Sequence, residues 1–206
     1  MRVAIVGGTG PFGRALAARL RESGDEVVIG SRDAARAAAT AATLGVEGAT
    51  NAEAVQDADL VVLATQADAA LSTARDLREA IGTTPVLSVA SELRITAGGA
   101  LPSPESTSIA ERIQAELEGP VVAGLHSLAA SNLGSERPPE EDAFVCGDNA
   151  PAKGLALDLA ARVTSGRALD AGPLATARAL EGLTAVIVNL NKRYRAHAGL
   201  RVTGIE

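Results

Sequence analysis

The stretch that decides the fold of this 206-residue chain is residues 3–13, which read Val-Ala-Ile-Val-Gly-Gly-Thr-Gly-Pro-Phe-Gly. Its first four residues are apolar, as is typical of a parallel strand buried on both faces. Three glycines follow at the spacing G-x-G-x-x-G. Phe12, Leu16 and Leu20 then recur at every fourth position, which predicts a helix with one apolar face. The sequence therefore opens with a strand, a glycine-rich turn and a helix.

This order of elements is typical of a dinucleotide-binding turn. Gly8 permits a tight turn, Gly10 lets the backbone approach a pyrophosphate, and Gly13 allows the helix to pack closely on the strand. The start of the helix adds free N–H groups and a partial positive charge. An ordinary strand–helix turn is the alternative, but the buried strand and the amphipathic helix favour a nucleotide site. The residues between the glycines, which would share that site, are Thr9, Pro11 and Phe12.

The end of the second predicted strand, residues 26–29, bears on which dinucleotide would bind. An NAD site usually carries a carboxylate there, which accepts from the ribose hydroxyl. This chain has Ser31 and Arg32, with Arg36 one helical turn further. A hydroxyl and two guanidinium groups suit the extra phosphate of NADP. Asp33 could instead turn inward, and the arginines could simply be a solvated helix start, but the pattern favours NADP.

The rest of the chain alternates between apolar strands and helices. This predicts an α/β fold, a Rossmann-type doubly wound parallel sheet with a small C-terminal α/β appendage. Further strands are expected at residues 60–63, 85–89, 121–125, 143–146 and 168–169, and helices at 33–44, 68–81, 109–117, 152–163 and from about 173. Asn51 is expected to cap a short helix, and residues 97–108 to form a long loop.

A polar stretch at residues 135–142, with two prolines, marks a boundary. We therefore expect an NADP-binding Rossmann domain at residues 1–134 and a small C-terminal domain at residues 135–206. The final helix is apolar nearly all round, so it must be covered by protein. We expect this second domain to contribute to an acceptor pocket and to a homodimer interface.

Composition argues against several classes of function. Only 1% of the residues are aromatic and the net charge is −6, so a nucleic-acid partner is not expected. The chain has only one cysteine, Cys146, and two distant histidines, His126 and His197. These are too few sulfur and nitrogen ligands for a metal site of the zinc type. The apolar runs are shorter than a membrane span, and the N-terminus lacks the pattern of a signal peptide. We expect a cytoplasmic protein with no metal, no nucleic acid and no membrane partner.

His126 follows the predicted strand at residues 121–125, at the sheet edge where ligands bind. It faces either a pair of reacting rings or merely a loop carbonyl. The two lysines, Lys153 and Lys192, lie outside the predicted nucleotide turn, so no acid–base group is evident. This scarcity favours hydride transfer between two cofactor-like rings, a reaction in which positioning is most of the task.

Motifs along the whole chain resemble the NADPH-dependent reductases of the deazaflavin coenzyme F420 (F420H2:NADP oxidoreductases). The resemblance rests on residues 1–10, on Gly30-Ser31-Arg32, and on the segments 124–128, 145–148, 169–174 and 189–200. It implies a small Rossmann domain with a C-terminal domain, a homodimer, and direct hydride exchange between NADP(H) and F420.

The resemblance also implies roles for individual residues. His126 and Leu128 would lie beside the facing rings as catalytic residues, and Arg178 and Thr184 on the last helix would lie by the deazaflavin. On the nucleotide side, the 2′-phosphate would contact Thr9, Ser31 and Arg32, and the pyrophosphate would contact Gly10, Pro11 and Phe12.

The chain departs from the family pattern on the acceptor side. Thr65-Gln66-Ala67 replaces Pro-Trp, Ala90-Ser91-Glu92 replaces Asn-Pro, and Gly182 replaces a serine of archaeal relatives. Thr65 and Ala90 are expected near the nicotinamide. Two alternatives therefore stand beside F420 reduction: an NADP-dependent reductase of another flavin, a quinone or a ferric acceptor, and a non-catalytic NADP-binding redox sensor.

Overall fold

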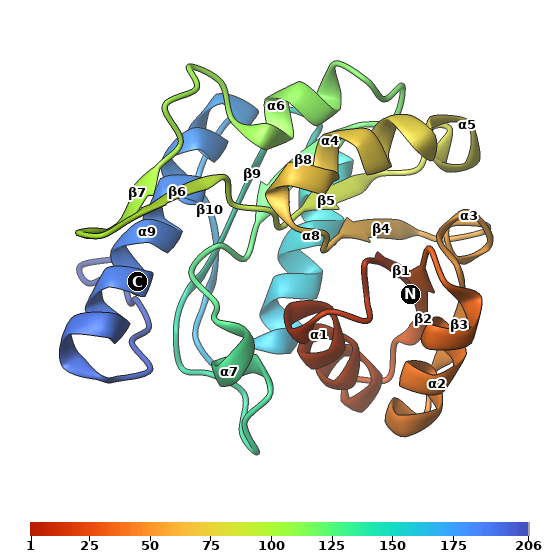
Figure 1. Cartoon of the computed structure of the whole chain (residues 1–206), viewed down its shortest axis with the longest axis horizontal. Helices are drawn as coiled ribbons and strands as arrows, with labels where there is room; N and C mark the ends of the chain where they lie inside the picture. The colour runs from red at the N-terminus through yellow and green to blue at the C-terminus, as the bar shows by residue number, and fades with distance from the viewer. Residues whose placement is uncertain (206) are drawn as a thin grey trace.

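The computed structural model describes residues 1–205 and contains one eight-stranded sheet, in the order β10-β9-β8-β5-β4-β1-β2-β3 (Figure 1). Neighbouring strands are parallel except for β8 and β9. The strands are β1 Arg2–Val6, β2 Glu26–Ser31, β3 Glu47–Thr50, β4 Leu60–Leu63, β5 Val86–Ser88, β8 Val121–Gly124, β9 Ala143–Gly147 and β10 Ala168–Asp170.

Helices cover both faces of this sheet, which confirms the predicted doubly wound α/β fold. Val3 and Ile5 of β1 pack with α1 and α8 on one face, whereas Ala4 and Val6 pack with α4, α6 and α9 on the other. None of the helices within residues 1–205 has both the length and the apolar character needed to cross a membrane. The helices are α1 Pro11–Glu22, α2 Ala34–Leu44, α3 Asn51–Ala54, α4 Ala67–Asp76, α5 Arg78–Ile81, α6 Ile109–Gln114, α7 Ala130–Leu133, α8 Ala150–Val163, the 3₁₀ helix η1 Leu174–Thr176 and α9 Ala177–Tyr194.

The antiparallel strand β9 differs from the expected all-parallel sheet. A parallel return needs a crossover, usually a helix that spans the sheet. The chain between β8 and β9 contains only the four-residue helix α7, whereas the 14-residue α8 precedes the parallel strand β10. Because β9 and β10 extend the same sheet, residues after 134 are continuous with the Rossmann core, and their description as a separate domain stays a prediction.

The segment around residue 50 also differs from expectation. Strand β3 was not predicted, and Thr50, rather than Asn51, caps α3. The Thr50 hydroxyl accepts from the Glu53 N–H at 3.3 Å, and the Glu53 carboxylate accepts from the Thr50 N–H at 3.0 Å. This capping box leaves Asn51 free to face the carboxyl edge of the sheet.

A hairpin occupies the first half of the long loop expected at residues 97–108. Its strands are β6 Leu93–Thr96 and β7 Gly99–Pro102, paired antiparallel. Asn189 of α9 holds β7 in place: its Oδ1 accepts from the Ala100 N–H, and its Nδ2 donates to the Ala100 carbonyl, both at 2.8 Å. The hairpin therefore depends on a contact with a distant part of the chain, which a local pattern does not reveal.

The glycine turn brings α1 into direct contact with the end of β1. A Cβ at Gly13 would lie 2.6 Å from the Gly8 Cα, and one at Gly8 would lie 2.8 Å from the Ile5 carbonyl oxygen. Both obstacles are backbone atoms, which cannot move aside as a flexible side chain would. The turn therefore requires glycine at these two positions.

We expect Gly13→Ala to lower the free energy of unfolding by about 1–3 kcal/mol, because the added methyl overpacks a backbone contact. Gly154→Ala in α8 is the matched control, since a Cβ there meets no atom within 4 Å. The control should gain about 0.5–1 kcal/mol from helix propensity. Urea unfolding measures both. A Gly13→Ala variant with the same free energy of unfolding as the wild type would contradict the packing described above.

Candidate functional site

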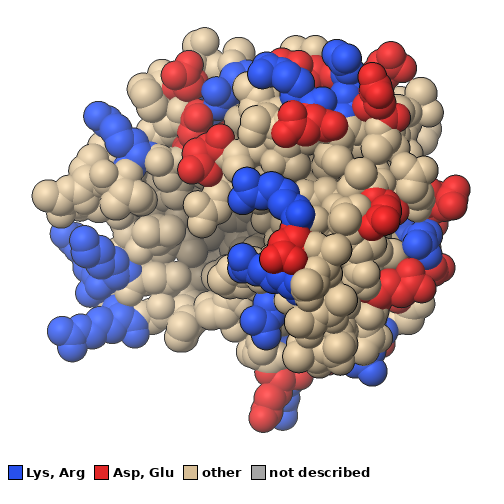
Figure 2. Space-filling model, turned by 45° about the vertical axis from the view of Figure 1, so that its right-hand side comes forward, with Lys and Arg blue, Asp and Glu red and all other residues tan. Residues whose placement is uncertain are grey.

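The strand order reverses between β1 and β4, and ligands bind in open α/β sheets at the carboxyl ends of such strands. Two cavities open at this edge. We call them the glycine-turn cavity, of about 550 Å³, and the histidine cavity, of about 730 Å³. They share the lining residues Ala64, Thr65, Gln66 and Asp68, so they adjoin one another, and together we call them the cleft. Figure 2 shows the molecule hollowed near the centre of one face, with basic side chains along one side of the hollow.

The start of α1 borders the glycine-turn cavity. Gly10 is the N-cap residue, and no side chain caps the helix. Its first turn contains no acidic residue, so nothing neutralises the N-terminal partial charge. The Gly10 N–H donates to the Gly7 carbonyl at 3.1 Å, which closes the turn. Thr9 and Gly10 line the cavity, and these features together fit the phosphate groups of a dinucleotide.

The end of β2 supplies positive charge to the same cavity. Ser31, Arg32 and Arg36 line it, and within residues 1–205 neither arginine forms an ion pair. Asp33 also lies there, but its Oδ1 accepts from the Arg36 N–H at 3.1 Å and thereby caps α2. The carboxylate is therefore engaged with its own helix, and the two exposed guanidinium groups fit a phosphate.

Two buried polar atoms in the glycine-turn cavity have no hydrogen-bond partner among the described residues. They are Asn51 Oδ1 and Thr65 Oγ1. Unpartnered buried polar atoms are costly, so both are candidates to bind a ligand. Sequence reasoning identified Thr65 but missed Asn51. The signal that would have found Asn51 is its place directly after β3, at the carboxyl edge next to β2.

His126 lines the second cavity and is only 5% exposed. Its Nε2 lies 3.2 Å from the Ala90 carbonyl oxygen. A carbonyl only accepts, so Nε2 carries the proton, and Nδ1 has no partner within the described chain. Burial lowers the pKa of His126 to about 4. The side chain therefore does satisfy a loop carbonyl, and it presents a neutral, fixed ring at neutral pH.

A hydroxyl chain joins three elements beside His126. The Thr184 hydroxyl donates to the His126 carbonyl oxygen at 3.1 Å, and it lies 2.8 Å from the Ser91 hydroxyl. Thr184 has one hydroxyl proton, so Ser91 must donate to Thr184. The segment after β5, the segment after β8 and helix α9 are thereby connected at the cavity wall. Sequence reasoning missed Ser91, although its place after β5 at the carboxyl edge marks it as a candidate.

The remaining predicted site residues are placed differently. Phe12, Ala90 and Leu128 line the histidine cavity with Thr184. Arg178 lines neither cavity, and its Nε donates to the Glu105 carbonyl at 2.8 Å. Three other residues of the turn lie outside both linings: Gly8 and Gly13, which pack the turn, and Pro11, which is exposed at the helix start.

A doubly wound sheet with a glycine turn and unpaired arginines at its switch point, and a second cavity beside them, defines a Rossmann-type dinucleotide-binding oxidoreductase. Residues 2–92 match the family model described as NADP oxidoreductase, coenzyme F420-dependent. The F420-dependent NADP reductase of Methanothermobacter marburgensis is 34% identical over 100% of this chain and 99% of its own. The enzyme of the same name from Methanocaldococcus jannaschii is 33% identical, with all of both chains covered.

A crystal structure of similar shape comes from Arthrobacter sp. FB24 and is provisionally assigned as an F420-dependent NADP reductase. It superimposes with a TM-score of 0.85 at 27% identity, over 99% of this chain and 100% of that one. The chain thus belongs to the family of coenzyme F420-dependent NADP oxidoreductases, which confirms the family resemblance found in the sequence.

The low pKa of His126 predicts a pH-dependent stability difference between the wild type and His126→Asn. The unfolded histidine takes up a proton below its ordinary pKa of 6.5, whereas the folded one does so only below about 4. The contribution of His126 to the free energy of unfolding is therefore lost as the pH falls from 6.5 to 4, and the total loss is about 3 kcal/mol. Denaturant unfolding at pH 6.5 and pH 4 measures how much the free energy of unfolding differs between the wild type and the variant. A difference that does not change with pH would mean that His126 ionises normally.

Proposed function

We propose that this protein exchanges a hydride directly between NADP(H) and coenzyme F420. The observation that carries the proposal is that the glycine-turn and histidine cavities adjoin along Ala64, Thr65, Gln66 and Asp68. A nucleotide anchored over the glycine turn would extend its nicotinamide toward the histidine cavity. The archaeal relatives of matching length are named for the same reaction.

The nucleotide end of the cleft supplies fixed donors rather than long-range attraction. The whole chain carries a net charge of −6, which repels an anionic ligand at a distance. Affinity must therefore come from the backbone N–H groups at the start of α1 and from local side chains. We assign the 2′-phosphate to Ser31, Arg32 and Arg36, with Thr9 beside them, and the pyrophosphate to the turn at Gly10.

The acceptor end is suited to holding a flat ring without proton chemistry. A bound NADPH supplies a hydride from its nicotinamide ring. The neutral His126 ring, held by the Ala90 carbonyl, provides a fixed surface, and Leu128 excludes water beside it. Hydride transfer needs contact and alignment of two carbons, which fixed side chains supply. The roles of Thr65, Ala90 and Thr184 on the acceptor wall are part of this proposal, and so is a contact of Arg178, which lines neither cavity, with the deazaflavin.

The open histidine cavity distinguishes the enzyme from a sensor. A sensor needs no space for a second ring, whereas a cavity of about 730 Å³ adjoins the nucleotide cavity here. Family membership favours F420 over another flavin, a quinone or a ferric acceptor.

The assay follows the absorbance band of the oxidised deazaflavin with NADPH and with NADH. We expect exchange with NADPH, and we expect Arg32→Ala to weaken NADP binding by about 1–3 kcal/mol because charged hydrogen bonds to the phosphate are lost. The affinity for NAD, which lacks that phosphate, should change little. Arg21→Ala, an exposed arginine of α1 outside both cavities, is the control.

Absence of exchange with either nicotinamide cofactor would refute the proposed reaction. Equal losses for NADP and NAD in Arg32→Ala would leave the reaction standing and remove Arg32 from the phosphate site.

We also propose that the protein is a cytoplasmic homodimer, formed through α9 and the β6–β7 hairpin. Ile95 is 73% exposed, Val186 49% and Tyr194 69%. Val186, Leu190 and Tyr194 also line a cavity of about 660 Å³ between α9 and the hairpin. Exposed apolar groups of this kind, gathered in one place, are typical of protein interfaces. Ile95 lines the histidine cavity as well, so a partner there would border the acceptor site.

Val186→Asp should raise the dimer dissociation constant by at least about tenfold, because it buries a charge in an apolar interface. Ala39→Asp on the exposed side of α2 carries the same charge change and should not alter assembly. Sedimentation velocity over a dilution series measures both. A wild type that stays monomeric at high concentration would contradict the proposal.

A further inference from the structure

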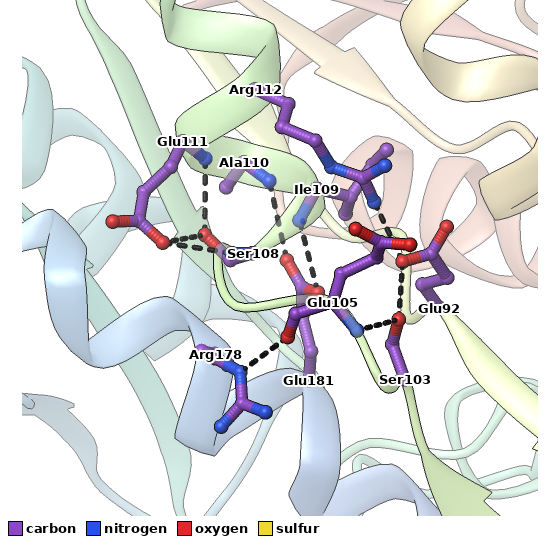
Figure 3. Close-up of polar contacts among 10 residues, drawn as sticks. All are labelled: Glu92, Ser103, Glu105, Ser108, Ile109, Ala110, Glu111, Arg112, Arg178 and Glu181. Atoms are coloured by element: carbon purple, nitrogen blue, oxygen red, sulfur yellow. Dashed lines mark hydrogen bonds and ion pairs between the residues drawn. The ribbon is translucent and has the colours of Figure 1, made fainter.

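Glu181 is a buried carboxylate in the second turn of α9, and the proposed hydride transfer does not use it. Glu181 is only 4% exposed. Each of its oxygens accepts one backbone hydrogen bond: Oε2 from the Ile109 N–H at 3.1 Å and Oε1 from the Ala110 N–H at 3.2 Å. Figure 3 shows the carboxylate of α9 pointing at these two amides.

These contacts complete the N-terminus of α6. Helix starts leave N–H groups without partners and carry a partial positive charge. Glu181 binds the first two of these groups, and the Ser108 hydroxyl accepts from the third, at Glu111, at 3.0 Å. The Glu111 carboxylate in turn accepts from the Ser108 N–H at 2.8 Å. Half of this cap is local, and the other half comes from a residue about 70 positions away, so Glu181 attaches α9 to α6.

One turn further along, α9 also contributes to the wall of the histidine cavity. Thr184 follows Glu181 by three residues and therefore lies on nearly the same helical face. Its hydroxyl donates to the His126 carbonyl and accepts from Ser91, as described above. Helix α9 is thus fixed to the sheet at two neighbouring points, first at the start of α6 and then at the wall of the histidine cavity. Displacement at the first point is transmitted to the second because the helix between them is rigid.

Among residues 1–205, no cation forms an ion pair with Glu181. Arg112 of α6 is paired with Glu92, which follows β5, at 2.6 Å, and Glu92 also accepts from Ser103 (Figure 3). The other charged or titratable groups of the elements packed against this part of α9 are Glu111 of α6, Arg94 of β6, the Cys146 thiol of β9 and Arg178 of α9 itself, while β7, β8 and η1 contribute none.

Burial raises the pKa of Glu181 to about 7, although its two backbone hydrogen bonds act in the opposite direction. Its protonation state therefore changes within the range of neutral pH.

We propose that Glu181 is a positioning residue for the acceptor half of the cleft, and that its attachment to α6 holds α9 where Thr184 and Ser91 shape the acceptor wall. The attachment is strongest while Glu181 is protonated, because ionisation leaves a buried charge that no cation pairs with, and it weakens as the pH rises through neutrality. The inference rests on the proposed function, because it concerns binding of F420. The nucleotide half is built on β1, α1 and β2, so NADP binding should not depend on Glu181.

The test compares Glu181→Gln, which mimics the protonated form, with the wild type at pH 6 and pH 8. The dissociation constant for F420 is measured by quenching of its fluorescence, and that for NADP by calorimetry. The two proteins should bind F420 nearly equally at pH 6, and the wild type should bind it up to about tenfold more weakly than the variant at pH 8, because the protonated fraction of the wild type falls about tenfold over this range whereas glutamine cannot ionise. Comparison at each pH cancels any titration of F420 itself.

Glu111→Gln is the matched control, since it makes the same change at the same helix start without touching α9. It should leave the F420 ratio near one at both pH values, and NADP binding should stay within twofold of the wild type in both variants. A ratio of the variant's F420 dissociation constant to that of the wild type that is the same at pH 6 and pH 8 would overturn the proposal. So would equal losses for F420 and NADP, which a general loss of structure produces.

A second measurement needs no variant. Hydrogen exchange at the Ile109 and Ala110 amides, corrected for intrinsic rates, should show protection falling about tenfold from pH 6 to pH 8 in the wild type, as Glu181 ionises. Constant protection would overturn the proposal even if Glu181→Gln does not fold. A wild type that does not exchange hydride with F420 would instead refute the proposed function, and the protection measurement would still report on Glu181.

Discussion

The contact between Gly13 and Gly8 is the constraint on which the cleft depends. It allows α1 to begin directly on the end of β1, where the strand order reverses. The free N–H groups of that helix therefore face the crevice, and no acidic side chain in the first turn opposes an anion. A methyl group at Gly13 would push the helix away from the turn, and one at Gly8 would collide with Ile5 and Ile29 of the sheet. The arginines after β2 and the cavity beside β4 matter only because the turn places a nucleotide between them.

The two halves of the cleft solve different physical problems. The nucleotide half must hold several negative charges on a protein that is itself acidic, and it does so with local donors at fixed positions. The acceptor half must align two rings and exclude water, and the apolar Leu128, the small Ala90 and the hydrogen-bonded pair Ser91 and Thr184 in its wall suit this task. His126 illustrates the second requirement: burial keeps it neutral, and the Ala90 carbonyl fixes its orientation. Such a site needs no proton donor for a hydride to pass.

Features encoded by neighbouring residues could be predicted from the sequence, and features that depend on distant contacts could not. The strand, turn and first helix follow from spacing within residues 3–20, and the structure confirms them. The sequence left undecided whether Asp33 turns toward the nucleotide site. Its position follows from the preference of aspartate for the N-cap, here at the start of α2. The β6–β7 hairpin requires Asn189, and the start of α6 requires Glu181, each far away along the chain. Asn51 was missed because the strand before it is short and weakly apolar.

The most direct test of the account follows deuterium from the nicotinamide. NADPH carrying deuterium at the reactive carbon, from one face and then from the other, is mixed with F420 in ordinary water, and the reduced deazaflavin is analysed by mass spectrometry and NMR. Contact between two rings in a closed cleft predicts that deuterium from one face alone appears in the product, with no loss to water. Protium in its place, or transfer from both faces, would contradict direct exchange in this cleft.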